Sequence, residues 1–341
     1  MDKIRIIADA MGGDNAPDAI VEGALSAREA SDIALTLCGD AEAIRAAARK
    51  CVRSLEGVEI IDTPVSVEMD DDPMCVIKSK RDSSMALGLK ALKEGRGDAF
   101  VSAGSTGALT VGGTFIVKRM KGIRRAGIGA LLPTDTMPVL LMDSGANNVC
   151  IPQDLVTFAT LGSVYMNKIM GVERPAVGIA NIGVEPHKGT DLQVEAYKLL
   201  QQSGLHFIGN AEVRDIPFGV CDVVVCDGFT GNIFLKTYEG TAKMMSANIK
   251  RILKKNPVTL IGALFVKGGF EALGRKLDAK SYGGAPLLGL NAPVIKAHGS
   301  ADAQTFANTI AQARRMAEQR VVETIRESIQ TTGGASDEGN P

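Results

Sequence analysis

Residues 223–236 read Val223-Val-Val-Cys-Asp-Gly-Phe-Thr-Gly-Asn-Ile-Phe-Leu-Lys236. The first four residues are apolar and mostly β-branched, which predicts a short, buried parallel strand. Asp227, Gly228 and Gly231 then favour a sharp turn, and a long helical pattern begins near Asn232. A strand, turn and helix in this order direct backbone N–H groups and the positive end of a helix dipole at one point. The turn is therefore a candidate anion site, although an ordinary turn between a strand and a helix explains the same residues.

Apolar strand-like runs alternate with helical patterns along most of the chain. The predicted strands are residues 4–8, 34–38, 58–61, 99–102, 128–132, 139–142, 176–180, 207–208, 223–226, 287–290 and 294–297. The predicted helices between them are residues 18–31, 41–51, 83–94, 106–118, 152–169 and 191–202. This alternation indicates an α/β fold with a mostly parallel sheet and helices on both of its faces.

Small and polar residues follow five of these predicted strands. They are Asp9, Gly12 and Gly13; Gly104, Ser105, Thr106 and Gly107; Asp143 and Asn147; Asn181 and Gly183; and Asp227, Gly228, Gly231 and Asn232. The carboxyl ends of parallel strands lie at one edge of a sheet, where the ligands of open α/β folds bind. The five loops therefore predict a shared small-molecule site with an anionic component. Asn232 could donate a hydrogen bond there without adding charge.

The composition is that of an ordinary globular protein. The 341 residues are 45% hydrophobic and 23% charged, with a formal net charge of -1, which gives no reason to expect a nucleic-acid partner. The six cysteines are scattered and form no CxxC pair, as expected in a reducing cytoplasm. We find no signal-peptide pattern, and the longest apolar run, residues 258–266, is about half of the ~20 residues that a membrane span requires.

Several well-known catalytic motifs are missing from the sequence. It contains no GxxxxGKS/T phosphate loop, no GxGxxG after the first strand, no GxSxG and no HExxH. Only three histidines occur. We therefore expect no serine-type triad, no cofactor and no metal.

Lys188 is the leading candidate for a phosphate-binding side chain. It lies in the segment Glu185-Pro-His-Lys-Gly-Thr190, just before a predicted helix. A lysine in this position can hold phosphate as a compact point charge, assisted by helix N–H groups. A solvated surface lysine is the alternative. His298, after the last predicted strand, is the better candidate for a functional histidine, whereas His187 suits the surface.

Residues 241–277 form a basic region in which Pro257 separates two predicted helices. The cations before the break are Lys250, Arg251, Lys254 and Lys255, and the apolar residues after it are Leu260, Ile261, Leu264 and Phe265. Such a hairpin could lie on an anionic membrane surface or receive an acidic protein. A helical hairpin at a subunit interface is the alternative.

We expect residues 1–330 to form one α/β catalytic domain that includes this hairpin. Residues 302–330 have the apolar periodicity of one long amphipathic helix packed on the body. Residues 331–341 are mostly small and polar and are expected to be disordered.

The motifs also match a known family in order and spacing. The matching segments are Ala8-Asp-Ala-Met-Gly-Gly-Asp14, Lys80-Arg-Asp-Ser-Ser-Met85, Ser102-Ala-Gly-Ser-Thr-Gly-Ala-Leu109, Asp143-Ser-Gly-Ala-Asn147, Asn181-Ile-Gly183, Lys188-Gly189, Asp227-Gly-Phe-Thr-Gly-Asn232, Tyr282-Gly-Gly-Ala-Pro-Leu-Leu-Gly289 and Ala297-His-Gly-Ser300. Together they resemble the bacterial phosphate acyltransferases, also called acyl-acyl carrier protein:phosphate transacylases. The chain departs from the family pattern after Gly183, where Val184 and Pro186 leave only Glu185 of an acidic run, and at Asn291-Ala292, where Asn-Gly is usual.

The resemblance implies a Rossmann-like three-layer α/β/α sandwich, related to the phosphotransacetylase and isocitrate dehydrogenase-like folds. It implies a homodimer that moves a long acyl chain from acyl carrier protein to inorganic phosphate, giving acyl phosphate for phospholipid synthesis. It also implies a cytoplasmic protein that associates peripherally with the inner face of the cell membrane.

Within this resemblance, we expect phosphate held by Lys188 and the loop amides to attack the thioester directly, while Asn232 stabilises the developing oxyanion. Two alternatives are a decarboxylating dehydrogenase of the related fold and a non-catalytic scaffold at the membrane surface.

Overall fold

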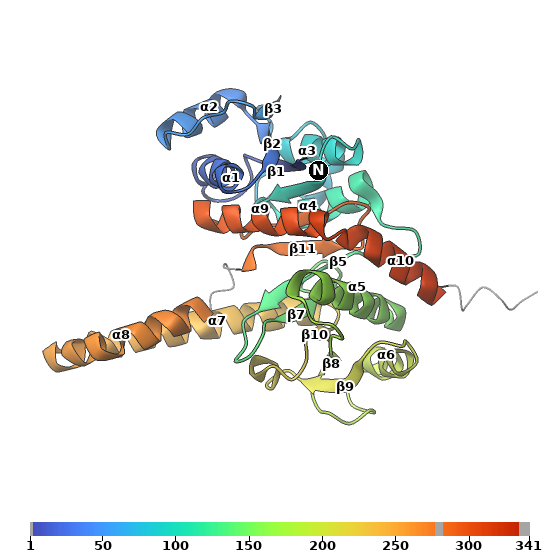
Figure 1. Ribbon diagram of the computed structural model, residues 1–341. Helices are drawn as coiled ribbons and strands as arrows, with labels where there is room; N and C mark the ends of the chain where they lie inside the picture. Colours follow the sequence, from blue (N-terminus) through green and yellow to red (C-terminus); the bar gives the residue numbers. More distant parts are fainter. Residues whose placement is uncertain (1–2, 277–281, 334–341) are drawn as a thin grey trace, which may run out of the picture.

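The computed structural model describes residues 3–276 and 282–333 (Figure 1). Within these residues the strands form two sheets, and not the single sheet that the alternating patterns predict. A seven-stranded sheet has the order β3-β2-β1-β4-β12-β11-β5, and a five-stranded sheet has the order β6-β7-β10-β8-β9. The α/β class and the mostly parallel pairing are confirmed, since antiparallel pairs involve only β11 with its two neighbours and β6 with β7.

The strand bounds follow the apolar runs closely. The larger sheet contains β1 (Ile4–Asp9), β2 (Ile33–Gly39), β3 (Glu59–Asp62), β4 (Ala99–Ser102), β5 (Gly127–Ile128), β11 (Ala285–Leu288) and β12 (Val294–Lys296). The smaller sheet contains β6 (Ala130–Leu132), β7 (Val139–Met142), β8 (Val177–Asn181), β9 (Phe207–Glu212) and β10 (Val223–Val225). The short apolar run that begins at Val223 thus forms β10, a central strand of the smaller sheet.

The helices fill the expected gaps. They are α1 (Asp18–Ala30), α2 (Ala41–Lys50), α3 (Ser84–Lys93), α4 (Thr106–Gly112), α5 (Pro152–Met170), α6 (Asp191–Gln201), α7 (Gly228–Leu253), α8 (Pro257–Lys276), α9 (Ala303–Glu318) and α10 (Val321–Gly333). Short 3-10 turns occur at Pro73–Ile77 (η1) and Ile216–Phe218 (η3). The helical run that begins at Thr106 continues after α4 as a π-helix (η2, Gly113–Lys118).

Each sheet is covered on both faces. On the larger sheet, α1, α2 and α9 pack on the face that carries Ile6 and Ala8, whereas α3 and α4 pack on the face that carries Ile7. On the smaller sheet, α5 and α6 cover one face, and side chains from the start of α7 reach the other. One buried apolar cluster joins Val101 of β4 with Leu140 of β7, so the two sheets share part of a core.

Gly129 marks the point where the chain passes from the larger sheet to the smaller one. The apolar run 128–132 predicts a single strand, but β5 ends at Ile128 and β6 begins at Ala130. A Cβ atom on Gly129 would lie 3.0 Å from Leu140 Cδ1 and 3.1 Å from Met142 Sδ. The crossing therefore lies in a tightly packed space that suits a residue without a side chain.

The carboxyl-terminal segment is two helices and not the one long helix that its periodicity predicts. The break lies between α9 and α10, where Arg320 adopts a φ of 53°, in the left-handed region that interrupts a right-handed helix. α10 continues to Gly333, three residues into the segment expected to be disordered. The rest of that segment, 334–341, lies outside the described residues.

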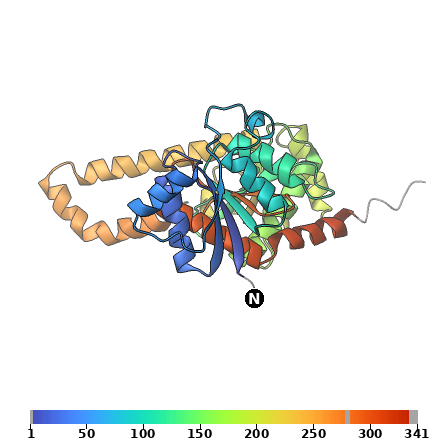
Figure 2. The ribbon, with the colours of Figure 1, turned by 90° about the horizontal axis from the view of Figure 1, so that it is seen from above.

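Helices α7 and α8 form a hairpin that projects from the body of the molecule (Figures 1 and 2). Its turn is closed by Asn256 and Thr259, because the Asn256 side chain accepts a hydrogen bond from Thr259 N at 2.9 Å and Thr259 Oγ1 accepts one from Asn256 N at 3.1 Å. Pro257 occupies the first position of α8, where its missing N–H costs nothing.

The start of α7 is held against the loop that follows β7. The Asp143 carboxylate is fully buried and accepts five hydrogen bonds: Oδ1 from the N–H groups of Ile128, Gly145 and Ala146, and Oδ2 from the backbone N–H and side-chain amide of Asn147, at 2.7–3.1 Å. Burial raises the pKa of Asp143, and these hydrogen bonds act in the opposite direction. One carboxylate therefore determines the shape of the whole loop.

Two glycines allow α7 to approach this loop. A Cβ atom on Gly231 would lie 1.9 Å from the carbonyl oxygen of Asp143, and one on Gly228 would lie 2.8 Å from the backbone of Asn147. Gly228 N also donates a hydrogen bond of 2.7 Å to Asn147 O. Both glycines are needed for close packing and not only for a turn.

A buried lysine joins two strand ends of the larger sheet. Lys296, at the end of β12, is only 7% exposed, and its Nζ donates to Ala103 O at 3.0 Å and to Ala297 O. Burial lowers the pKa of Lys296 to about 8, although the carboxylates of Asp14 and Asp9 raise it. The lysine thus ties the loop after β4 to the loop after β12.

Replacing Gly231 by Ala should destabilise the fold by about 1–3 kcal/mol, because the new methyl group collides with the Asp143 carbonyl and forces α7 or the loop to move. Urea unfolding would measure this change. Gly240→Ala is a matched control on the same helix, since a Cβ atom there meets nothing within 4 Å. That control should be stabilised by about 0.5–1 kcal/mol, and equal effects of the two substitutions would contradict the packing argument.

The buried Lys296 should make folding stability depend on pH. Its pKa of about 8 in the folded protein lies below the ordinary value of 10.5, so the unfolded chain binds more protons between these two values. Stability of the wild-type protein should therefore rise by about 2 kcal/mol relative to Lys296→Met between pH 7.5 and pH 9.5. Urea unfolding of both proteins at the two pH values would measure it. A difference that stays constant with pH would show that the ammonium group is not desolvated.

Candidate functional site

A cavity of about 450 Å³ lies where the loops of the two sheets meet. Its lining residues come from η1, from α4, from the loop after β7 and from the first turns of α7; they are Pro73, Thr106, Gly107, Thr110, Val111, Ser144, Gly145, Ala146, Asn232 and Lys236. Thr106 and Gly107 begin α4, which follows β4 of the larger sheet, whereas Ser144 follows β7 and Asn232 lies in the helix after β10, both of the smaller sheet. The expected meeting of loops is therefore between two sheets and not along the edge of one. A second hollow, of about 370 Å³ on α9, contains none of the sequence-predicted site residues.

Asn232 lies in the first turn of α7 at this cavity. It is exposed and packs beside Gly145, where a Cβ atom would be 3.5 Å from Asn232 Cγ. Among the described residues, nothing hydrogen-bonds to its side-chain amide. The group is thus available as a neutral donor, and its contact with a ligand stays a prediction.

The amides at the start of α7 do not form the predicted cradle for an anion. Gly228 N donates to Asn147 O, Thr230 N donates to Asp227 Oδ1 at 2.9 Å, and Gly231 N donates to Asp227 O at 2.9 Å. Asp227 is a helix cap whose other oxygen accepts from Thr230 Oγ1. The prediction of free N–H groups at this turn is wrong for Gly228, Thr230 and Gly231, because the protein's own carboxylate and carbonyl groups accept their hydrogen bonds.

Asp9 has a similar internal role in the larger sheet. Its Oδ1 accepts from Ser84 Oγ at 2.7 Å and from Met11 N at 3.2 Å, while Oδ2 accepts from Ser102 Oγ at 2.7 Å. Burial raises the pKa of Asp9, and these hydrogen bonds lower it. Asp9 thus connects the ends of β1 and β4 to the start of α3 and is absent from the cavity lining.

The glycines at this edge pack against one another. A Cβ atom on Gly12 would lie 2.6 Å from Gly104 N, and one on Gly13, whose φ is 103°, would lie 2.9 Å from Gly299 O. Ser105 caps α4 by accepting from Ala108 N. Of this predicted group, Thr106 and Gly107 line the cavity, and the others support the loops behind it.

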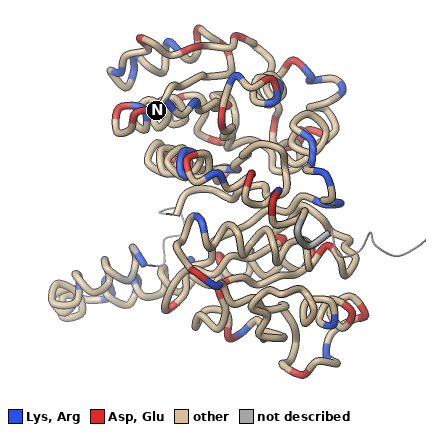
Figure 3. The backbone as a smooth tube through the Cα atoms, turned by 45° about the vertical axis from the view of Figure 1, so that its right-hand side comes forward, with Lys and Arg blue, Asp and Glu red and all other residues tan. Residues whose placement is uncertain are grey.

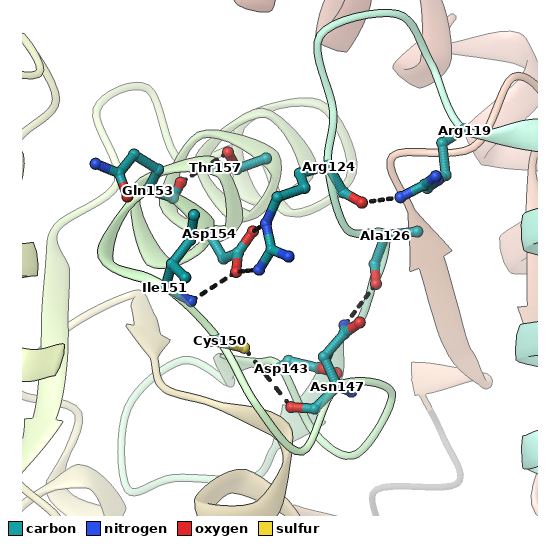
Figure 4. Close-up of polar contacts among 10 residues, drawn as sticks. All are labelled: Arg119, Arg124, Ala126, Asp143, Asn147, Cys150, Ile151, Gln153, Asp154 and Thr157. Carbon is teal, nitrogen blue, oxygen red and sulfur yellow. Dashed lines mark hydrogen bonds and ion pairs between the residues drawn. The ribbon is translucent and has the colours of Figure 1, made fainter.

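Figure 4 shows how the loop after β7 is anchored. The Asn147 amide donates to Ala126 O at 2.7 Å, and Cys150 Sγ contacts Asn147 O. Nearby, Arg124 Nε donates to Asp154 Oδ1 at 2.9 Å, and Asp154 caps the start of α5. Asn147 is therefore a supporting residue and does not line the cavity.

Lys188 lies in the loop between β8 and α6. Its carbonyl accepts a hydrogen bond of 2.9 Å from the Asn181 amide, and its side chain packs near Gly183. β8 and β10 are parallel neighbours, so this loop leaves the same sheet edge as the turn that carries Asn232. Lys188 does not line the cavity in this structure.

His298 follows β12, where its Nδ1 lies 3.0 Å from Ser300 Oγ and 3.2 Å from Ser300 N. Burial lowers the pKa of His298; Glu239 raises it, and the charges of Lys236, Lys296 and Lys243 lower it further. Two of these lysines and Glu239 belong to α7. The structure therefore brings His298 of the larger sheet close to the helix that carries Asn232.

Lys236 and Lys296 were not predicted from the sequence as site residues. Lys236 follows Asn232 by four residues, which places both on one face of a helix. That spacing was the only available signal, because nothing in the pattern shows which face borders the cavity. Lys296 resembles any lysine at a strand end until its burial is known.

The cysteines near the site are poor nucleophiles. Burial raises the pKa of Cys150 to about 12, and it raises the pKa of Cys226 well above its ordinary value. Both therefore remain protonated thiols near neutral pH. Within the described residues, no group of His, Cys, Asp or Glu side chains could hold a metal ion.

The hairpin residues selected from the sequence lie around the tip. Lys250, Arg251, Lys254, Lys255, Leu260, Ile261, Leu264 and Phe265 are all exposed. Figure 3 shows basic positions along the hairpin, away from the body. Leu264 and Phe265 are 70% and 87% exposed, which is unusual for large apolar side chains. In the part of the chain that the structure describes, we find no helix with the length and apolar character of a membrane span.

Comparison with known proteins places the chain in a family. A family model described as "Fatty acid synthesis protein" matches residues 4–324. The chain is 44% identical over 331 residues to the phosphate acyltransferase of Thermoanaerobacter pseudethanolicus, covering 97% of this chain and 98% of that protein. It is 43% identical over 332 residues to the phosphate acyltransferase of Shouchella clausii, covering 97% and 100%.

Solved structures confirm the fold at much lower identity. A phosphotransacetylase from Streptococcus pyogenes superposes with a TM-score of 0.63 at 17% identity, covering 93% of this chain and 94% of that one. A putative 4-hydroxythreonine-4-phosphate dehydrogenase from Salmonella typhimurium gives a TM-score of 0.53 at 14% identity, with 93% and 100% covered. The family model and the near full-length relatives show that this chain belongs to the phosphate acyltransferases, a family of enzymes.

Proposed function

We propose that this enzyme transfers a long-chain fatty acyl group from the thioester of acyl carrier protein to inorganic phosphate and releases acyl phosphate. The observation that carries the proposal is the unpartnered Asn232 amide at a cavity built by loops of both sheets. A neutral donor there can stabilise an oxyanion without competing for the charged phosphate.

The reaction needs no covalent enzyme intermediate. A phosphate oxygen attacks the thioester carbonyl carbon, and the C–O bond forms as the carbonyl oxygen becomes an oxyanion. The C–S bond then breaks, the carrier leaves as a thiolate that is protonated by solvent, and acyl phosphate remains. The raised pKa values of Cys150 and Cys226 support this route, because neither thiol supplies a thiolate near neutral pH.

Lys188 is proposed to add positive charge around the phosphate from the neighbouring loop. The loop that carries Lys188 leaves the sheet at the same edge as the turn that carries Asn232. The Asn181 amide holds this loop by its hydrogen bond to the Lys188 carbonyl. Asp9, Asp143, Asn147 and Asp227 act indirectly in this proposal, since their side chains shape the loops and the start of α7.

The hairpin is proposed to contact acyl carrier protein and the inner face of the cell membrane, with the enzyme acting as a cytoplasmic homodimer. Exposed cations at the tip suit an acidic carrier or anionic lipids. The adjacent face of α8, with Leu260, Ile261, Leu264 and Phe265, suits insertion among lipid chains.

Phosphate-dependent release of thiol from acyl carrier protein tests the reaction. Asn232→Ala should lower kcat by about 10²–10³-fold, as expected for loss of one oxyanion donor. Lys188→Ala should also lower turnover. The assignment fails if both variants are folded and retain wild-type rates. A wild-type protein that binds the carrier without releasing thiol would instead act as a scaffold, and stabilisation by NAD(P) with a divalent metal would favour a dehydrogenase.

Binding through the hairpin should weaken with salt. Attraction between exposed charges is largely screened beyond about 10 Å at an ionic strength of 0.1 M. The affinity of the hairpin for acyl carrier protein and for anionic vesicles should therefore fall as the NaCl concentration rises. Substituting Lys250, Arg251, Lys254 and Lys255 by Gln should remove most of this salt dependence. Vesicle flotation and carrier titration would measure both.

A second pair of variants tests the contribution of apolar side chains to membrane binding. Phe265→Ser should reduce vesicle binding, whereas Phe218→Ser, at a 69% exposed position on the body, should not. Equal losses for the two variants, or binding insensitive to salt, would argue against the hairpin as the contact.

A further inference from the structure

Lys236 has no assigned role in the proposed reaction, yet it is well placed for one. It lies one helical turn after Asn232 on α7, and both residues line the cavity between the sheets. Among the described residues of the cavity lining, Lys236 alone carries a formal charge. A phosphate that binds there requires a counter-charge, because transfer of an unpaired anion out of water is costly.

Lys236 pairs with a residue of its own helix and lies near basic groups of the larger sheet. Its Nζ lies 2.9 Å from Glu239 Oε2, and Glu239 is the more buried partner, at 28% against 61% side-chain exposure. Burial is the main cause of the lowered pKa of Lys296 and of His298. The charge of Lys236 lowers both pKa values further. Lys236 thus lies where α7 faces the carboxyl end of β12, a strand inside the larger sheet.

The neighbouring basic groups are less suited to hold an anion. Nζ of the buried Lys296 already donates to Ala103 O and Ala297 O. His298 has a lowered pKa and engages Ser300 through Nδ1, so it offers at most a neutral ring N–H near pH 7. Lys236 remains the accessible cation at the cavity.

We propose that Lys236 binds the attacking phosphate in this cavity. The inference rests on the proposed acyl transfer and adds the residue that carries the acceptor's counter-charge. Asn232 and Lys236 share one face of one helix, so α7 itself sets the distance between the oxyanion donor and the phosphate. Glu239 keeps the ammonium group oriented along this face through the 2.9 Å contact.

Lys236→Met, Lys236→Arg and a control, Lys198→Met, test the proposal. Lys198 pairs with Glu195 three residues away on α6 at 2.7 Å, and both are exposed. This is a lysine–glutamate pair of the same spacing on a helix that does not line the cavity. Calorimetry with inorganic phosphate gives Kd, and thiol release with phosphate and acyl donor varied separately gives the two KM values. Lys236→Met should raise Kd and KM for phosphate by about 10- to 100-fold, as expected for a lost charge-assisted hydrogen bond.

The other outcomes are equally specific. Lys236→Arg should recover most phosphate affinity, and Lys198→Met should behave as wild type. Unchanged phosphate Kd and KM in folded Lys236→Met would overturn the proposal. An increase confined to the KM of the acyl donor would also overturn it, because Lys236 would then contact the donor and not the attacking phosphate. If wild-type protein releases no thiol, the proposed function fails, while calorimetry still tests phosphate binding by Lys236.

Discussion

The site depends on the buried carboxylate of Asp143. Its five hydrogen bonds shape the loop after β7, and the carbonyl of the same residue limits how closely α7 can approach. Because Gly231 has no side chain, the helix begins directly against that carbonyl. Asn232 therefore owes its position to a contact made by the preceding residue, and not to any hydrogen bond of its own amide. Because backbone packing holds Asn232 in place, its side-chain amide remains free to donate a hydrogen bond to a substrate.

Much of the architecture could be predicted from local patterns. β10 and α7 were recognised because a β-branched run, glycines and a helical period follow one another, although α7 begins at Gly228, inside the predicted turn. The division at Gly129 could not be recognised, because residues 128–132 form one apolar run and the atoms that enforce the crossing belong to Leu140 and Met142. The break at Arg320 was missed for a related reason, since both helices keep the same apolar period across it.

Prediction of the site residues had a different limit. The sequence identified loops that meet, but it could not separate side chains that line the cavity from those that support the loops. Asp9, Asp143 and Asp227 were expected at a ligand, yet their oxygens accept hydrogen bonds from the protein. Lys236 lay within the same opening segment and was passed over because a lysine in a helix is usually solvated. Burial and hydrogen bonding, which need the whole fold, decide these roles.

Helix α7 also connects the cavity with the tip of the hairpin. Its first turn carries Asn232, and its last turn, with Lys250 and Arg251, lies at the tip of the projecting hairpin. A continuous helix of 26 residues is about 39 Å long and stiff. Its beginning is held to the body by the close contact of Gly231 with Asp143 and by the packing of Phe234, Leu235 and Tyr238 on the smaller sheet, and the rest of the helix projects. A slight tilt there becomes a large displacement at the tip, so anything that immobilises the hairpin also restricts the angle at which the helix enters the cavity.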